Sequence, residues 1–103
     1  MKEILLGDIK NFEKHKGYTF NLEGRDIFVY FLKNSILAID NCCSHEKYPL
    51  DDGLIDEEKK VVTCIHHGAK FDLLTGKALS LPAFNSINIY KIIKKENLLY
   101  IRI

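Results

Sequence analysis

The apolar positions of this chain fall into short runs, some of them alternating with polar positions, and this pattern predicts β-strands rather than helices. The runs are rich in β-branched and aromatic residues, which pack well on the pleated surface of a sheet. Turn-forming residues such as Gly24 and Asn34-Ser35 separate one run from the next. The predicted strands cover residues 4–6, 18–20, 26–32, 35–40, 60–63, 69–72, 78–81, 87–92 and 98–103.

Neighbouring runs at two places in the chain are close enough to form β-hairpins. The runs on either side of residues 33–35 predict one hairpin, and the last two runs, which flank Glu96-Asn97, predict another at the C-terminus. A helical turn is expected only over residues 11–16, before Gly17. The sequence therefore predicts an all-β domain of short strands.

Length and composition narrow the class of protein. A chain of 103 residues with 47% apolar and 28% charged residues is typical of one globular domain. The 15 basic and 14 acidic residues nearly balance, and no basic stripe with interleaved aromatic residues indicates nucleic-acid binding. No apolar run approaches the ~18–20 residues of a membrane-spanning helix. Residues 1–8 do not resemble a secretory signal, so we expect a cytoplasmic protein.

Two stretches without a strand pattern, residues 41–53 and 64–76, contain the reactive side chains. All three cysteines and three of the four histidines lie in them. From Cys42 the first stretch reads CCSHEKYPLDDG, and from Cys64 the second reads CIHHGAKFDLLTG. Each loop offers a soft thiolate and an imidazole within a few residues, a combination that suits zinc or an iron–sulfur centre. The odd number of cysteines argues against a disulfide framework.

The two loops resemble the cluster-binding boxes of the Rieske family. The family pattern is Cys-x-His followed by Pro-Leu and Gly and, later in the chain, Cys-x-x-His-Gly followed by Phe-Asp and Thr-Gly. Pro82-Ala83 is similar to the proline-containing loop that covers the cluster in the family. The positions that match the two boxes are Cys43, His45, Pro49, Leu50, Gly53, Cys64, His67, Gly68, Phe71, Asp72, Thr75 and Gly76.

The register of the first box decides which cysteine matches the family. The residues that follow His45 match only if His45 is the paired histidine, and the family's cysteine is then Cys43. Cys42 is accordingly expected to be a small buried apolar residue at a strand end rather than a ligand. We expect His66 at the rim of the site, and His15, which is distant in sequence from both loops, at the surface.

The resemblance implies a fold, a cofactor and a ligand set. The fold is a Rieske-like arrangement of antiparallel sheets, forming one domain over residues 1–103 with a small cluster-binding subdomain at about 41–83. One 2Fe–2S cluster is expected there, with two thiolates on one iron and two neutral imidazoles on the other. The ligands that the resemblance implies are Cys43, His45, Cys64 and His67.

The resemblance also implies a range for the reduction potential. High-potential members of the family have a disulfide between the two loops and hydroxyl groups directed at sulfur. Neither that disulfide nor those hydroxyl bonds can come from the matching residues of this chain, which are Tyr48, His66, Ala69 and Phe71. The expected potential is therefore in the lower part of the roughly −150 to +300 mV range of Rieske centres.

The function implied is that of a diffusible, monomeric one-electron carrier rather than an enzyme. The family suggests a flavin reductase as the electron donor and a Rieske-type oxygenase as the acceptor. Three alternatives to the electron-carrier function remain. They are the small subunit of a nitrite reductase-like enzyme, a redox or iron sensor, and a zinc-bound structural module.

Other side chains near the boxes receive simpler interpretations. Tyr48 and Phe84 are expected to pack in the core. An acidic run between the boxes is interpreted as a solvated loop, with a docking patch for a basic partner as the alternative. The acidic residues are Asp51, Asp52, Asp56, Glu57 and Glu58.

Overall fold

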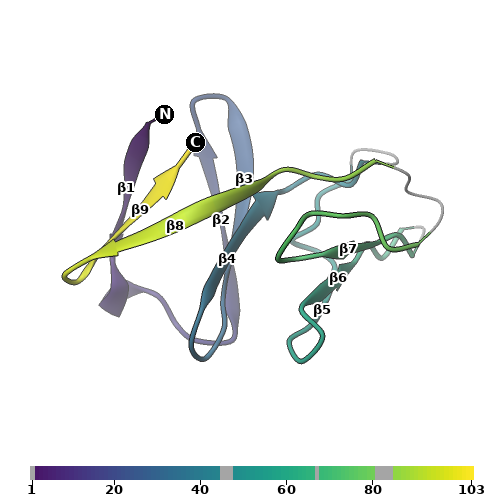
Figure 1. The fold of residues 1–103 in the computed structure, drawn as a ribbon, viewed down its shortest axis with the longest axis horizontal. Coiled ribbons are helices and arrows are strands. Elements are labelled where there is room, and N and C mark those ends of the chain that lie inside the picture. The colour runs from purple at the N-terminus through teal and green to yellow at the C-terminus, as the bar shows by residue number, and fades with distance from the viewer. Residues whose placement is uncertain (1, 45–47, 67, 81–84) are drawn as a thin grey trace.

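The computed structural model describes residues 2–44, 48–66, 68–80 and 85–103, which are arranged mostly in short antiparallel strands (Figure 1). A short 3-10 helix, Ile9–Asn11, follows the first strand. The nearly all-β class that the sequence predicts is confirmed. The strands in chain order are β1 (Glu3–Asp8), β2 (Lys16–Leu22), β3 (Arg25–Phe31), β4 (Ile36–Asp40), β5 (Leu54–Asp56), β6 (Val61–Thr63), β7 (Lys70–Asp72), β8 (Ile89–Lys95) and β9 (Leu98–Arg102).

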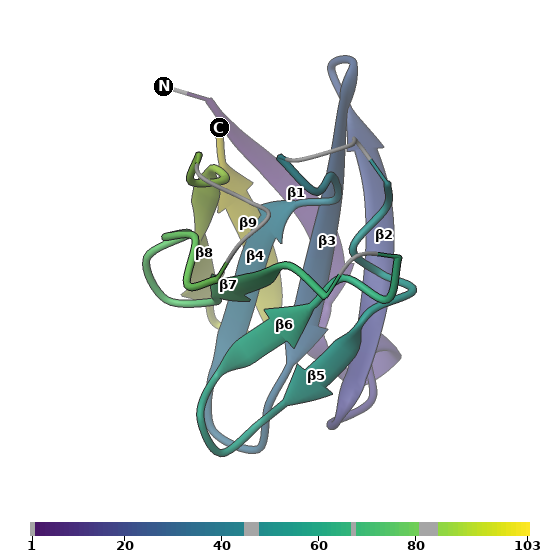
Figure 2. The same ribbon diagram turned by 90° about the vertical axis from the view of Figure 1, so that its right-hand side faces the viewer.

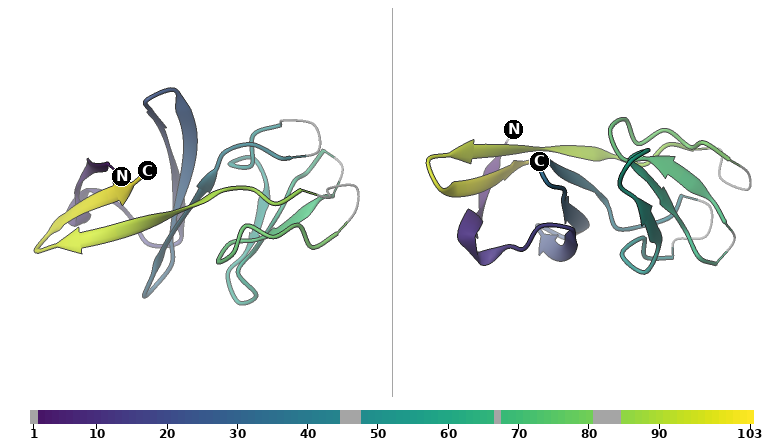
Figure 3. Two further views of the ribbon diagram at one scale, coloured as in Figure 1. Left: turned by 45° about the horizontal axis from the view of Figure 1, so that its top comes forward. Right: turned by 90° about the horizontal axis from the view of Figure 1, so that it is seen from below.

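The strands form two sheets. Six strands make the larger sheet, in the order β1-β9-β8-β4-β3-β2, and the other three make a smaller sheet, in the order β5-β6-β7. Figure 2 shows the smaller sheet in front of β2, β3 and β4 of the larger one. The molecule is elongated, about 40 × 28 × 19 Å, with the β8–β9 hairpin at one end and the smaller sheet at the other (Figure 3).

Both faces of β3 are buried, which places this strand between two cores. Successive side chains of a strand point to opposite faces of the sheet. Ile27, Val29 and Phe31 pack on one side, against the β9 strand and the 3-10 helix region. Phe28 and the partly buried Tyr30 face the other side, toward the smaller sheet. The continuous apolar and aromatic run that predicts β3 from the sequence is thus explained by the burial of both of its faces.

The second of these cores, here called the intersheet core, joins the two sheets and the two loops. It is contiguous, and hydrophobic burial of this kind is the main favourable term in folding. It includes two of the three cysteines. Its buried members are Phe28, Ile39, Cys43, Leu50, Val62, Cys64, Ala69, Phe71, Leu73 and Ile87.

Both predicted hairpins are present. β3 pairs with β4 and β8 pairs with β9, in each case antiparallel. Lys95 is paired with Leu98, so Glu96-Asn97 forms the two-residue turn that the sequence predicts. Backbone hydrogen bonds of 3.2 and 2.9 Å between Lys2 and Ile103 extend the pairing of β1 with β9 and hold the two ends of the described chain together.

Two strand predictions are wrong. Leu54–Asp56 form β5, where the sequence analysis expects a loop; the strand is short and partly exposed, so it lacks the apolar run by which strands are recognised. Residues 78–80 form no strand. Ala78 makes one isolated bridge to Phe71, and residue 81 lies outside the described residues.

The helical turn lies earlier in the chain than predicted. It covers Ile9–Asn11 rather than residues 11–16, because the Asp8 carboxylate accepts a hydrogen bond from the Lys10 amide at 3.0 Å and caps it. Within the described ranges, no helix has the length and apolar character needed to cross a membrane.

A hydrogen-bonded bridge connects the larger sheet to the turn after β5. Glu57 in this turn accepts a hydrogen bond of 2.8 Å from the Tyr30 hydroxyl, and its other oxygen lies 2.7 Å from Nδ1 of His15. The bonds from His15 and Tyr30 hold the pKa of Glu57 below its usual value of 4.5. Burial and the bond to Glu57 raise the pKa of Tyr30 to about 12. The His15–Glu57–Tyr30 bridge therefore depends on an ionised Glu57 and a neutral tyrosine.

Replacing Glu57 with glutamine is expected to lower the free energy of unfolding above about pH 5 and to have little effect at more acidic pH. A carboxyl group whose pKa is lower in the folded than in the unfolded state stabilises the fold while it is ionised. That contribution is lost as the pH falls through the folded-state pKa. Urea denaturation of wild-type protein and E57Q at a series of pH values between roughly 3 and 7 measures the difference.

The neighbouring Glu58, which is exposed, provides a matched control. E58Q removes the same charge from the same turn and is expected to follow the wild-type stability profile at every pH. If E57Q and E58Q give the same profile, the bridge does not stabilise the fold in the way described.

Candidate metal centre

Cys43 and Cys64 lie at the base of the two loops that the sequence analysis singles out. Cys43 follows the end of β4, and Cys64 comes directly after β6. Each side chain is 1% exposed, and both belong to the intersheet core. The two sheets therefore bring together two thiols that are 21 residues apart in the sequence.

The first loop is held by hydrogen bonds at its base. Asn41, 6% exposed, donates through its side chain to Asp26 at 3.2 Å, and its side-chain oxygen accepts from the Asp51 amide at 2.8 Å. The Cys43 amide donates to the carbonyl oxygen of Tyr48 at 2.7 Å, which closes the loop around the cysteine. Asn41 is not among the site residues predicted from the sequence, although an asparagine directly after a strand is typical of side-chain hydrogen bonding to a turn.

The second loop is closed in a similar way around Cys64. Its amide donates to the Ala69 carbonyl at 2.7 Å, and its carbonyl oxygen accepts from the Gly68 amide at 2.9 Å. The Ser80 hydroxyl donates to the Gly68 carbonyl at 3.4 Å and accepts from the Lys70 amide at 3.2 Å. These bonds tie the loop to the segment after β7.

The turn that follows β7 explains the Phe-Asp and Thr-Gly pairs of the second box. Phe71 is fully buried in the intersheet core. The Asp72 carboxylate accepts from the Leu74 amide at 2.7 Å, and the Gly76 amide donates to the Asp72 carbonyl at 2.7 Å. Gly76 has φ of 78°, and a side chain there would meet the backbone of Ile87. A residue other than glycine would therefore be strained at this position.

The tips of the two loops meet through a pair of rings. The Tyr48 ring and the His66 imidazole are stacked, with centroids 3.8 Å apart and planes inclined by 18°. His66 is exposed, as a rim position requires. Tyr48 is 37% exposed, so the prediction that it packs in the core is wrong.

Cys42 differs from the two buried cysteines. It is only half-buried, and its Sγ donates to the Cys43 carbonyl at 3.7 Å, so the expectation of a buried apolar residue is wrong. His45 and His67, the two histidines of the implied ligand set, lie outside the described residues, as do Pro82-Ala83 and Phe84. The assignment of the two histidines as ligands therefore stays a prediction.

The acidic run is not a uniformly solvated loop. Asp56 accepts a hydrogen bond from the Lys59 amide at 3.0 Å and shapes the turn after β5. Glu57 is held by His15 and Tyr30 in the bridge described above. His15 is exposed, as predicted, but its contact with Glu57 joins residues 42 positions apart and has no local sequence signal.

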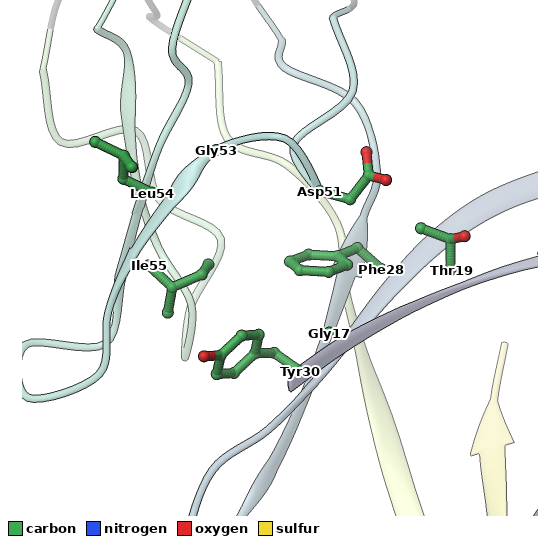
Figure 4. Close-up of a pocket in the computed structure, with 8 residues that line it drawn as sticks. All are labelled: Gly17, Thr19, Phe28, Tyr30, Asp51, Gly53, Leu54 and Ile55. Atoms are coloured by element: carbon green, nitrogen blue, oxygen red, sulfur yellow. The ribbon is translucent and has the colours of Figure 1, made fainter. Parts of the chain in front are cut away.

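An open pocket of about 410 Å³ lies between the sheets beside the first loop (Figure 4). The rings of Phe28 and Tyr30 face it from β3, and Ile55 faces it from β5, whereas the side chain of Leu54 points away from it. Phe28 occupies the space above Gly17, so any larger residue at position 17 would displace its ring. Since neither Cys43 nor Cys64 lines this pocket, it is separate from the candidate centre.

The described part of the site fits an iron–sulfur cluster. Thiolates are the soft ligands that iron–sulfur clusters require. Cys43 and Cys64 project from two different loops into one buried, largely apolar region, and Leu50, Ala69 and Phe71 of that region are all fully buried. Shielding from water is one of the properties by which a protein tunes such a centre.

Comparison with known proteins identifies the family. A family model described as the Rieske [2Fe-2S] domain matches residues 2–91. The chain belongs to the Rieske [2Fe-2S] family. The Rieske-type 2Fe–2S cluster that the sequence predicts is thereby confirmed as the cofactor.

Relatives and solved structures agree with this assignment. The ferredoxin component of the naphthalene 1,2-dioxygenase system of Pseudomonas putida is 35% identical over 98 residues, which cover 95% of this chain and 84% of the relative. The ferredoxin of carbazole 1,9a-dioxygenase from Nocardioides aromaticivorans has the same fold, with a TM-score of 0.89 at 23% identity over 98% of this chain and 97% of the other. A ferredoxin chain from a complex of reduced oxygenase and oxidized ferredoxin has a TM-score of 0.85 at 22% identity, over 96% and 91% of the two chains.

These similarities confirm the class of function predicted from the sequence. The relatives are ferredoxin components, which carry electrons and are not themselves catalytic. The Rieske protein described here is an electron-transfer protein.

Replacing Gly53 with alanine is expected to destabilise the protein by about 1–3 kcal/mol and to lower its iron content. A Cβ atom at this position would lie 2.5 Å from the Thr63 carbonyl oxygen and 2.9 Å from that of Leu50. Both neighbours are backbone atoms, so the first loop would have to move relative to the strand that leads into Cys64. Chemical denaturation and iron analysis of G53A measure the two effects.

The neighbouring residue Leu54 serves as a control because its side chain is 67% exposed. L54A is expected to keep the iron content of the wild-type protein. Normal iron content and stability in G53A would contradict the close approach between the loop and the strand.

Proposed function

We propose that this Rieske protein is a cytoplasmic, monomeric ferredoxin that passes single electrons from a flavin reductase to an oxygenase. The observation that carries the proposal is the joint burial of Cys43 and Cys64 in the intersheet core. The proposed ligands are these two cysteines with His45 and His67. The cluster-binding subdomain is about 41–83, within one domain over residues 1–103.

The side chains and backbone of this chain have two tasks in the proposed function. Cys43 and Cys64 bind the cluster at the edge of the intersheet core, where packing excludes water. The hydrogen bonds at their amides hold the two loops in one conformation. When bound, the cluster accepts and donates one electron at a time. A site that is already rigid has little to rearrange during such an exchange.

The surface near the two cysteines is suited to contact with another protein. Ile65, next to Cys64, is an apolar side chain that is 53% exposed. An exposed apolar residue beside a functional site is available for contact with a partner protein. The nature of the partner is inferred from the relatives, since the Pseudomonas putida protein is a component of a dioxygenase system. The chain structurally similar to this one in a complex of oxygenase and ferredoxin supports the same acceptor.

The purified protein is expected to be reddish, to contain iron and acid-labile sulfide, and to give an EPR signal after reduction with dithionite. Replacing Cys64 with serine should abolish the signal and the visible absorbance, because it removes a soft ligand from the buried site. Cys42→Ser is the matched control, since this neighbouring cysteine is half-buried and outside the proposed ligand set.

C42S is expected to retain the colour and the EPR signal of the wild-type protein. A colourless wild-type protein that contains zinc would overturn the proposal in favour of a structural zinc module. Loss of the cluster in C42S but not in C64S would show that the ligand assignment is wrong.

The reduction potential is expected in the lower part of the roughly −150 to +300 mV range of Rieske centres. The residues that match the hydroxyl donors of high-potential relatives are Ala69 and Phe71, and both are fully buried side chains without a hydroxyl group. Hydrogen bonds to sulfur raise the potential, so their absence at these positions favours a low value. Protein-film voltammetry measures the potential directly, and a value near the top of the range would contradict this reasoning.

A further inference from the structure

The stacked rings of Tyr48 and His66 lie on two different loops. Tyr48 belongs to the loop that contains Cys43, and His66 belongs to the loop that contains Cys64. A centroid separation of 3.8 Å and an inclination of 18° place the rings face to face. Aromatic rings attract one another in such an arrangement beyond the effect of the area they bury.

The stack is linked to both cysteines through short hydrogen-bonded paths. The Tyr48 carbonyl oxygen accepts the 2.7 Å hydrogen bond from the Cys43 amide. His66 lies within the segment that is closed by the 2.7 Å bond from the Cys64 amide to the Ala69 carbonyl. A force that holds the two rings together therefore acts on the backbone on which each cysteine is mounted.

Two side-chain hydrogen bonds of the loops are directed to another segment of the chain. The Ser44 hydroxyl donates to the Asn85 carbonyl at 2.6 Å, and the Ser80 hydroxyl donates to the Gly68 carbonyl at 3.4 Å. Each of these bonds ties one loop to the segment that follows β7 and precedes β8. The Tyr48–His66 stack differs because it joins a side chain of the first loop directly to a side chain of the second.

We propose that the Tyr48–His66 stack is a non-covalent clasp that holds the two loop tips together and limits access of water and chelators to the cluster. The inference rests on the ligand assignment made under the proposed function. Both residues are positioning residues, since they act through the loops that carry Cys43 and Cys64. A stacked pair of aromatic rings is expected to raise the equilibrium constant for the closed over the open loops by a factor of roughly two to ten.

Cluster release into excess iron chelator tests the clasp on the holoprotein. His66→Ala and Tyr48→Ala are each expected to speed the loss of visible absorbance roughly two- to tenfold. His66→Phe keeps an aromatic ring and is expected to restore a rate close to that of the wild-type protein. The double variant Y48A/H66A should release the cluster no faster than the faster single variant, because either change alone removes the whole interaction.

Leu74→Ala provides the control for a general loss of apolar surface. Leu74 lies in the turn after β7, and its side chain is aliphatic and 53% exposed. L74A is expected to release the cluster at the wild-type rate. If L74A accelerates release as much as H66A does, the effect is not specific to the ring pair, and the clasp is overturned.

Two further measurements separate a positioning role from general destabilisation. Opening the loop tips exposes the centre to water, which changes the electrostatic environment of the cluster. H66A and Y48A are therefore expected to shift the reduction potential in the same direction as each other. Both variants are also expected to change the EPR spectrum in the same way, and H66F is expected to reverse both effects. A potential and spectrum identical to those of the wild-type protein in H66A and Y48A would contradict the clasp.

Hydrogen exchange at the Cys43 and Cys64 amides, measured on the protein as isolated, separates this inference from the proposed function. Both amides donate the hydrogen bonds that close the loops, so H66A is expected to exchange them faster than H66F does. If the wild-type protein holds iron and sulfide but exchange and release are unchanged in H66A, the clasp is wrong and the ferredoxin assignment stands. If the wild-type protein holds no iron, the proposed function fails, and the exchange rates still decide whether the clasp exists.

Discussion

Burial of two cysteines in the core between the sheets is the constraint on which the rest of this structure depends. Cys43 and Cys64 are each 1% exposed and pack with side chains from β3, β4, β6 and β7. Core packing in proteins is dense and tolerates little displacement. The relative position of the two thiols is therefore set by the same contacts that hold the two sheets together, and a change in sheet packing would alter the proposed metal site as well.

The kind of interaction that holds the molecule together changes with distance from this core. At the core, apolar packing dominates; around it, backbone and Asn41 hydrogen bonds shape the loops. At the edge of the smaller sheet, the bridge of His15, Glu57 and Tyr30 connects the turn just after β5 to the larger sheet. The smaller sheet is thus attached by packing in its centre and by a charged contact at its periphery, where solvent weakens ionic interactions.

The sequence predicts most of the fold because the longer strands carry strong local patterns. The apolar and aromatic run of β3 predicts a strand from local sequence alone. The turn residues between β8 and β9 likewise predict a hairpin. β5 escapes prediction because it is three residues long, and its stability comes from pairing with β6 rather than from its own sequence. The motif spacing selects Cys43 and Cys64 as the proposed cysteine ligands, but it contains no information about long-range contacts such as those of Asn41 with Asp26 or of His15 with Glu57.

A ring stack and a disulfide would have different consequences for a protein that transfers electrons. A disulfide between the loops is itself reducible, so its state depends on the redox conditions around the protein. The contact between Tyr48 and His66 involves no thiol, and its strength is independent of those conditions. The stack is also much weaker than a covalent bond, so the loops remain closed only because each is already shaped by hydrogen bonds at its cysteine. A clasp of this kind therefore completes an ordered site and could not create one from disordered loops.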